Sequence, residues 1–354
     1  MQFKGIELCC PACRGDLTER PGAEPEFRCN QCGRGFPVIL GIPDLRLFAD
    51  PYIDFAADRA KGVELASHSG TLDFPALVEY YYLHTPVVPP HHARMYTRGL
   101  LAGAVRSQQA LISWEAAVGG PATRSDHQML EIGCGTAPFL VAAAARYPRL
   151  VGVDVAFRWL VVAQKRLAEA GLDLPLICGN AEALPFRPQT FDRVVAESVL
   201  EHVQDQSRVL AECWRVLRPH GWLYVATPNR LSLGPDPHTG IWAGGLLPRR
   251  WVEALVRRQG GIPPKRRLLS ARSLRRTLVQ AGFGAPEIWL PAITPTQRSL
   301  VGRKIQVLID AYMALRRFSI SRRVLLWIGP LFYAVAERSS IDPGLETAAK
   351  AEGQ

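Results

Sequence analysis

From residue 128 onward, short apolar runs alternate with longer amphipathic stretches. The apolar runs are four or five residues long, as expected for strands buried in a sheet, and cover residues 129–132, 150–153, 174–178, 193–196 and 222–226. Helical periodicity covers residues 139–145, 158–170, 208–216 and 273–281. Strands that alternate with helices of this length predict a parallel sheet with helices on both faces. We therefore expect a doubly wound α/β core over residues 127–291.

The segments before and inside this core follow other patterns. Residues 1–48 are rich in Cys, Gly and Pro and end on a strand-like apolar run at 36–40, which indicates a small module of its own. Residues 49–126 are mostly helical and predict a connector that caps the core. A Gly-, Pro- and Trp-rich insertion at about 230–268 interrupts the core. Because insertions after a late strand lie above the carboxyl edge of the sheet, we assign this one to substrate.

The C-terminal region, residues 292–354, begins with an amphipathic helical pattern at 300–318. Residues 324–336 follow as 13 uncharged positions, which are too few to cross a bilayer. Two interpretations of this run stay open. In the first, the run docks shallowly on a membrane. In the second, which we favour, residues 331–337 form the last antiparallel strand of the sheet.

Composition and charge narrow the class of protein. The chain has 354 residues, of which 48% are hydrophobic and 21% charged, and this balance predicts a globular protein rather than a disordered one. We find no apolar run of membrane-spanning length and no signal peptide, so we expect a cytoplasmic protein. Residues 246–338 hold 18 basic and 4 acidic side chains, against a slightly acidic remainder. This basic third predicts an anionic partner, and the inner face of a membrane is one candidate. The alternative is that the charges only form a solvated helical face.

Four of the eight cysteines have the spacing of a metal site. Cys10 and Cys13 form one CxxC pair, Cys29 and Cys32 form a second, and 15 residues separate the pairs. This spacing is typical of a four-thiolate zinc ribbon, and a module of 48 residues has too small a core to fold without such a staple. We expect a structural zinc ion here, since the protein fills all four ligand positions.

A second group of residues predicts a ligand-binding turn. Glu131, Gly133, Cys134 and Gly135 leave one strand and enter a helix, and the two glycines let the backbone approach a ligand closely. The dinucleotide fingerprint needs a glycine where Pro138 stands, which argues against a dinucleotide. Nineteen residues after Gly135, Asp154 ends the next strand with a carboxylate suited to a ribose.

With the Asn180-Ala-Glu-Ala-Leu-Pro-Phe run and the helix-to-strand corner at 214–221, residues 128–229 resemble class I S-adenosylmethionine-dependent methyltransferases. The resembling group includes the ubiquinone and menaquinone biosynthesis methyltransferases, which have a Rossmann-like sheet. The N-terminal module resembles the zinc ribbon of a small tRNA methyltransferase partner subunit. The chain departs from the family at Ala137, which replaces a third glycine, and at Asn180, where Asp is usual.

The resemblance also assigns roles to residues. It implies that Glu131, Gly133 and Gly135 shape the methionine pocket, that Asp154 holds the ribose, and that Asn180 and Ala181 meet the adenine. It extends the cofactor set to four neighbouring positions, Cys134, Val155, Glu182 and Glu197.

We expect O-methylation of a small-molecule, lipid-linked or glycan acceptor. A hydroxyl nucleophile needs a base of near-neutral pKa, and the candidates are His238 in the insertion and His202 after the fourth strand. Alternatively, His202 has no catalytic role and only caps a helix.

Other functions stay open. Methylation of an rRNA or tRNA base would suit a zinc ribbon beside a basic surface, but the basic run lacks interleaved aromatic residues and no Asn-Pro-Pro-Tyr type motif follows the fourth strand. A third possible function is that of a scaffold that binds the cofactor without turnover. The zinc ribbon is also a candidate contact for a protein partner.

Overall fold

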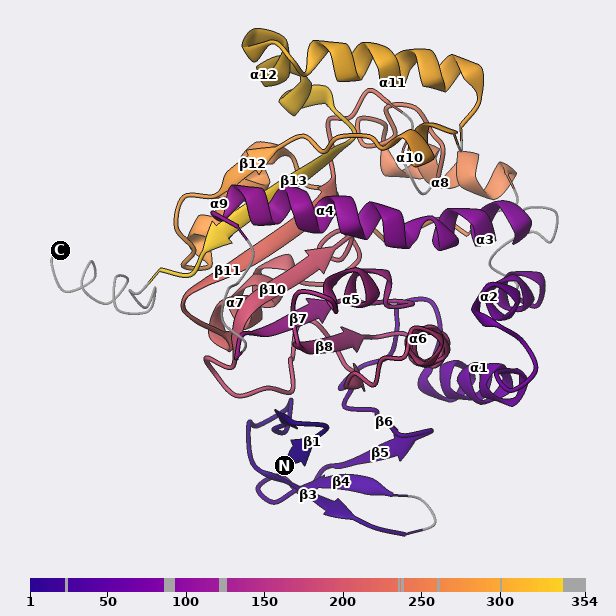
Figure 1. Cartoon of the computed structure of the whole chain (residues 1–354), viewed down its shortest axis with the longest axis vertical. Coiled ribbons are helices and arrows are strands. Elements are labelled where there is room, and N and C mark those ends of the chain that lie inside the picture. The colour runs from indigo at the N-terminus through magenta and orange to yellow at the C-terminus, as the bar shows by residue number, and fades with distance from the viewer. Residues whose placement is uncertain are drawn as a thin grey trace, which may run out of the picture.

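The computed structural model describes residues 1–22, 25–85, 93–120, 126–234, 236, 239–259, 262–299 and 301–339. A seven-stranded sheet lies at its centre, in the order β12-β13-β11-β10-β7-β8-β9 (Figure 1). The strands are β7 (Gln128–Ile132), β8 (Arg149–Asp154), β9 (Leu176–Cys178), β10 (Phe191–Glu197), β11 (Leu217–Pro228), β12 (Glu287–Trp289) and β13 (Leu331–Glu337). β7 to β11 are parallel, and β13 runs antiparallel to β11 and β12. The expected α/β fold with five strands from the apolar runs is therefore confirmed.

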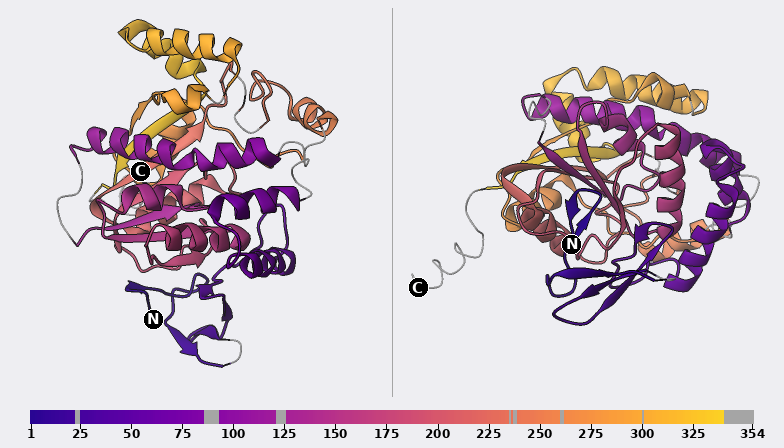
Figure 2. Two further views of the ribbon diagram at one scale, coloured as in Figure 1. Left: turned by 45° about the vertical axis from the view of Figure 1, so that its right-hand side comes forward. Right: turned by 60° about the horizontal axis from the view of Figure 1, so that its bottom comes forward.

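Two hydrophobic cores cover the two faces of this sheet, because alternate residues of each strand point to opposite sides. Val194 and Ala196 of β10 pack on one side with α7 (Gln206–Val216) and α9 (Ala271–Gln280). Val195 packs on the other side with α4 (Gly103–Ala117), α5 (Pro138–Ala143) and α6 (Phe157–Glu169). The remaining helices of the connector are α1 (Phe55–His68), α2 (Phe74–Leu83) and α3 (Ala93–Leu101), and Figure 2 shows them wrapping one side of the molecule. Gly62 lets α1 approach α6, because a Cβ there would clash with the Phe157 ring.

The N-terminal module is a small antiparallel unit at one end of the molecule (Figure 1). Its strands are β1 (Gln2–Phe3), β2 (Ile6–Glu7), β3 (Leu17–Arg20), β4 (Glu26–Cys29), β5 (Gly35–Ile39) and β6 (Ile42–Pro43), and β3 to β6 form one sheet. The module docks on the core by a parallel bridge between Asp44 and Cys178 and by an antiparallel bridge between Leu8 and Phe186. Arg14 adds an ion pair of 2.7 Å to Glu212 of α7.

The insertion and the C-terminal region lie toward the other end of the molecule (Figure 1). They contain α8 (Arg249–Arg258), α10 (Pro295–Ser299), α11 (Arg303–Leu315) and α12 (Ser319–Ile328). The expected helix at 300–318 is thus shorter, from Arg303 to Leu315. The uncharged run at 324–336 divides into the end of α12 and the strand β13, so the interpretation of 331–337 as a strand is correct. Among the described residues no helix is both long enough and apolar enough to span a bilayer.

Candidate functional site

A cavity of about 310 Å³ opens at the carboxyl ends of β7, β8 and β10. This is the edge at which parallel sheets bind ligands. Five segments line it, with residues 48–52, 132–133, 153–156 and 158–159, 179–182, and 198–199 and 202–204. Apolar surface dominates the lining, and the polar groups come from a few positions such as Asp154 and Asn180. The cavity therefore has the character of a small-molecule site.

The turn after β7 has the backbone conformation that its glycines predict. Gly133 lines the cavity with φ +70°, and a Cβ there would clash with the Val199 side chain. The N–H groups of Gly133 and Cys134 both donate to the Val153 carbonyl, at 2.7 and 3.1 Å, which ties the turn to β8. Ala137 also adopts a left-handed φ of +57°, a conformation that costs a non-glycine residue about 1 kcal/mol. The replacement of the third glycine therefore keeps the shape of the turn at a small cost in stability.

Asp154 joins this turn to the cavity. Its carboxylate accepts from the Gly135 N–H and from the Ala156 N–H, each at 2.7 Å, and it lines the cavity beside Val155. Burial raises the pKa of Asp154, and the two backbone donors oppose that rise. Because a carboxylate accepts several hydrogen bonds at once, Asp154 can bind a ligand hydroxyl while it holds the turn.

The segment after β9 lines the cavity with Asn180, Ala181 and Glu182. The Asn180 side chain is already engaged, since its oxygen accepts from the Leu47 N–H at 2.7 Å and its nitrogen donates to the Phe48 carbonyl at 3.0 Å. Glu182 accepts from the Gln204 N–H at 2.9 Å. These side chains fix the walls of the cavity, and Ala181 leaves room between them.

Residues 48–52 and 158–159 line the same cavity, although sequence reasoning did not single them out. A buried ion network holds residues 44–58 in place. Arg46 donates to Asp44 and Asp58 at 2.7 and 2.6 Å, and the side chains of all three residues are fully buried. Arg158 of α6 bonds to Asp58 and to Asp50 on the cavity lip, at 2.7 and 3.2 Å. The N-terminal module is thus continuous with one wall of the cavity.

Four predicted cofactor residues do not line the cavity. Cys134 is buried in the core and Gly135 reaches the site only through its bond to Asp154. Glu131 is buried with its Oε2 lacking a hydrogen-bond partner in the described part of the chain, and burial, with the nearby charges of Glu197 and Asp154, raises its pKa. Glu197 faces Ser107 of α4 at 3.4 Å, and burial raises its pKa to about 7.

Of the two candidate bases, His202 lines the cavity, whereas His238 lies outside the described residues. His202 follows Glu201, which is fully buried and accepts from the Thr227 hydroxyl at 3.1 Å. Burial raises the pKa of Glu201 to about 7. The structure therefore puts His202 beside the space where a ligand would lie.

A second cavity, of about 570 Å³, lies in the insertion. Its lining carries four arginines, Arg230, Arg249, Arg266 and Arg267, and two carboxylates. Arg249 pairs with Glu253 and Arg266 pairs with Asp236, whereas Arg230 and Arg267 have no ion-pair partner among the described residues. The Arg267 N–H donates to the Glu201 carbonyl, and the Lys265 N–H donates to the Tyr52 hydroxyl on the lip of the first cavity. The two cavities are therefore neighbours, and we call the second one the basic groove.

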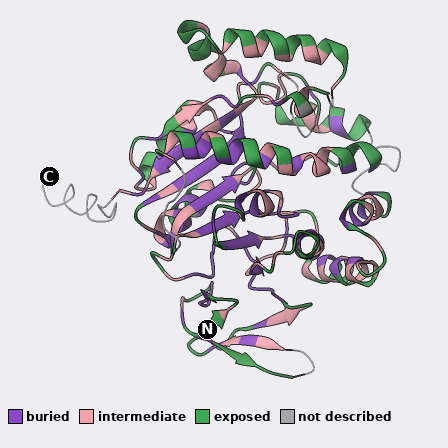
Figure 3. Cartoon of the chain, viewed as in Figure 1, coloured by how far each residue is buried: buried purple, intermediate pink, exposed green. Residues whose placement is uncertain are grey.

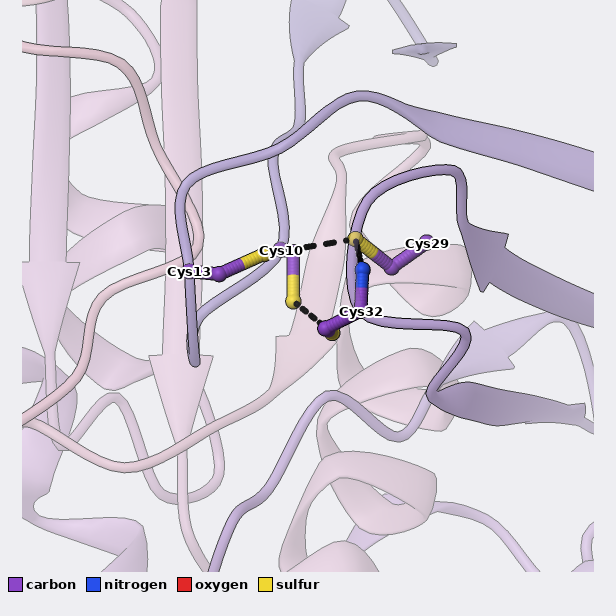
Figure 4. A group of neighbouring side chains, drawn as sticks. All are labelled: Cys10, Cys13, Cys29 and Cys32. Atoms are coloured by element: carbon purple, nitrogen blue, oxygen red, sulfur yellow. Dashed lines mark hydrogen bonds between the residues drawn. The ribbon is translucent and has the colours of Figure 1, made fainter.

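The four cysteines of the N-terminal module converge on one point (Figure 4). All four Sγ atoms lie within 4.8 Å of one another, with 3.7 Å between Cys10 and Cys32 and 3.4 Å between Cys13 and Cys29. A tetrahedral zinc ion with bonds of about 2.3 Å separates its sulfur ligands by about 3.8 Å. The arrangement therefore fits a four-thiolate zinc site. Cys9 is buried next to it and is not part of the group.

Comparisons with known proteins bear on the α/β core. A family model described as a methyltransferase domain matches residues 130–225. These residues form a methyltransferase domain. The match starts at β7 and ends within β11, so this domain contains the turn at Gly133, the carboxylate of Asp154 and the walls of the first cavity. The expected methyltransferase core is confirmed over this part of the chain.

Curated relatives match the same domain. The ubiquinone biosynthesis O-methyltransferase of Paracidovorax citrulli is 35% identical over 115 residues, which are 32% of this chain and 48% of that protein. A probable S-adenosylmethionine-dependent methyltransferase of Mycolicibacterium smegmatis is 38% identical over 115 residues, which are 32% of this chain and 42% of that protein. The chain thus matches less than half the length of these relatives.

Among solved structures, phosphoethanolamine N-methyltransferase 2 of Haemonchus contortus in complex with S-adenosyl-L-methionine is 17% identical. That alignment covers 77% of this chain and 61% of the other, with a TM-score of 0.47.

Proposed function

We propose that the chain transfers a methyl group from S-adenosylmethionine to a hydroxyl group of a small-molecule or lipid-linked acceptor. The observation that carries the proposal is the cavity at the carboxyl edge of the methyltransferase domain, with Gly133 and Asp154 in its lining. A backbone in left-handed conformation at Gly133 and a carboxylate at the end of the next strand suit a ligand that carries a ribose.

Different residues would have different roles in the methyl transfer. When bound, the cofactor supplies an electrophilic methyl group on a positively charged sulfur. Asp154 would accept hydrogen bonds from the ribose hydroxyls, and the turn at Gly133 would pass close to the methionine part. Tyr52 and Trp159 would shield the cavity from water, which favours an in-line transfer. The acceptor oxygen would bond to the methyl carbon as the carbon–sulfur bond breaks and the sulfur becomes neutral, and the hydroxyl proton would pass to an imidazole nitrogen of His202 or His238.

The base can be identified by mutation. Because general base catalysis contributes about 10²- to 10⁴-fold, we expect His202→Asn to lower the rate of methyl transfer by that range and to leave cofactor affinity unchanged. The assay follows labelled methyl into a lipid and small-molecule extract. His220→Asn, on an exposed residue of β11, is the matched control. A wild-type rate for His202→Asn would exclude His202, and a wild-type rate for His238→Ala would exclude His238.

The basic groove supports an acceptor that carries a phosphate or another anionic group. Arg230 and Arg267 offer exposed guanidinium groups beside the first cavity, and such groups bind phosphate in bidentate geometry. Arg266 is more deeply placed, with its side chain 6% exposed, and its Nε and Nη1 have no hydrogen-bond partner among the described residues. The groove therefore has more positive charge than its own carboxylates neutralise.

Inorganic pyrophosphate can serve as a probe of this groove. We expect it to inhibit methyl transfer in the wild-type chain, and the Arg230→Gln/Arg267→Gln variant to need about tenfold more of it or higher, because each charge-assisted bond contributes about 1.5–3 kcal/mol. Arg275→Gln/Arg276→Gln, on the exposed side of α9, is the matched control. If pyrophosphate inhibits both variants equally, or does not inhibit the wild type, the proposal of an anionic acceptor is wrong.

A further inference from the structure

The last two long helices expose large apolar side chains to solvent. We call residues 303–328 the C-terminal hairpin; it contains α11, α12 and the turn between them. Neither helix has a buried residue, and Figure 3 shows the hairpin almost free of buried surface. Ile320 is 79% exposed and Trp327 is 69% exposed. The surfaces of soluble proteins rarely expose a group of large apolar side chains to this extent. The exposed apolar residues are Val307, Leu308, Leu315, Phe318, Ile320, Val324 and Trp327.

On each helix, some of these residues lie along one side. In α12, Ile320, Val324 and Trp327 stand at positions i, i+4 and i+7, which lie in line on a helix surface. In α11, Leu308 and Leu315 stand one heptad apart, two turns along the same face. We call the line of Ile320, Val324 and Trp327 on α12 and the pair of Leu308 and Leu315 on α11 the apolar stripes.

Basic side chains flank these stripes. The hairpin holds six basic residues and one acidic residue, Asp310. Five of the six are exposed, namely Arg303, Lys304, Arg317, Arg322 and Arg323. A helix with a large apolar face and Lys or Arg beside it is typical of segments that lie in the plane of an anionic membrane surface.

The rest of the protein holds the hairpin in this exposed position. Asn229, at the end of β11, donates from its side chain to the Trp327 and Gly329 carbonyls, at 2.8 and 2.9 Å. Arg316 donates to the Leu290 carbonyl at 2.7 Å, and the Tyr312 hydroxyl donates to the Pro291 carbonyl at 3.1 Å. Polar contacts therefore anchor one side of the hairpin, while the apolar stripes stay outside the hydrophobic cores.

We propose that the C-terminal hairpin docks the protein on an anionic lipid bilayer, with its apolar stripes among the acyl chains and its basic residues at the headgroups. Charge favours this occupant over a second copy of the chain, because two hairpins packed face to face would bring their basic residues together. The hairpin lies at the end of the molecule opposite the N-terminal module (Figures 1 and 2), so that docking leaves the module free of the membrane. The proposal is independent of methyl transfer.

Vesicle flotation of the full chain tests it. We expect the chain to float with vesicles of phosphatidylcholine and phosphatidylglycerol, to float far less with phosphatidylcholine alone, and to detach as salt is raised. Ile320→Ser/Trp327→Ser and Arg322→Gln/Arg323→Gln should each lower the bound fraction about tenfold or more. Val63→Ser/Val279→Ser and Arg275→Gln/Arg276→Gln, on α1 and α9, are the matched exposed controls and should float like the wild type.

Two further measurements separate docking from other effects. Unchanged cofactor affinity and an unchanged melting temperature would show that the hairpin variants are folded. Sedimentation in the absence of lipid should give the same mass for the wild type and the apolar variant. A wild-type chain that stays at the bottom with anionic vesicles, hairpin variants that float normally, or a dimer that only the apolar variant loses would each overturn the proposal.

Discussion

We expect the replacement of Asp154 with alanine to raise the dissociation constant for S-adenosylmethionine by about a hundredfold or more. Two hydrogen bonds to a charged acceptor contribute about 1.5–3 kcal/mol each, and the substitution removes both of those expected from the ribose. It also leaves the N–H groups of Gly135 and Ala156 without their acceptors, because each donates to one of the two oxygens of this carboxylate. Isothermal titration of the cofactor is the measurement.

Two variants make this result specific. Asp173→Ala removes an exposed carboxylate that pairs with Lys4, and its cofactor affinity should equal that of the wild type. Asp154→Asn keeps one acceptor oxygen for the turn but loses the charge, so its affinity should fall between those of the other two chains. A folded Asp154→Ala variant that binds the cofactor like the wild type would show that this carboxylate does not hold the ribose.

The second large effect is expected at the zinc ribbon. Metal analysis of the purified chain should find one zinc ion, and Cys29→Ser/Cys32→Ser should abolish it. Structural zinc contributes about 10–16 kcal/mol to small domains of this kind, so the N-terminal module should lose its structure with the metal. Cys9→Ala, which removes a buried cysteine outside the group, should keep the zinc.

The loss of zinc should also reach the cofactor cavity. Residues 48–52 form one wall of the cavity and follow directly on the module, and Asn180 bonds to Leu47 and Phe48. We therefore expect the zinc-free variant to bind S-adenosylmethionine about tenfold more weakly, as a few hydrogen bonds of about 1 kcal/mol are lost. A chain without zinc that keeps wild-type structure and affinity would contradict a structural role for the metal.

The core of the fold was predictable because its signals are local. Apolar runs locate β7, β8 and β10, and the glycines at 133 and 135 locate the turn between β7 and α5. Asp154 follows from the same reasoning, since its position at the end of β8 puts it beside that turn. Hydrophobic periodicity and backbone conformation act over a few residues, so one sequence is enough to identify them.

The other wall of the cavity was not predictable, because long-range contacts create it. Residues 48–52 are held at the site by Arg158, which bonds to Asp50 and Asp58 across about 100 residues of chain. Arg46 joins Asp44 to Asp58 within the same segment. Such ion networks leave no periodic signal in a sequence.

The division of 324–336 into helix and strand does have a local signal at Gly329 and Pro330, because the residue before a proline disfavours the helical conformation.

Transfer of labelled methyl from S-adenosylmethionine into a cell extract tests the central claim most directly. After the reaction the extract is separated into lipid, small-molecule, nucleic-acid and protein fractions, with the Asp154→Ala variant in parallel. The account predicts label in the lipid or small-molecule fraction, and its loss with the variant. Label in RNA would contradict the proposed acceptor class, and a wild-type chain that binds the cofactor but labels no fraction would contradict the proposed activity.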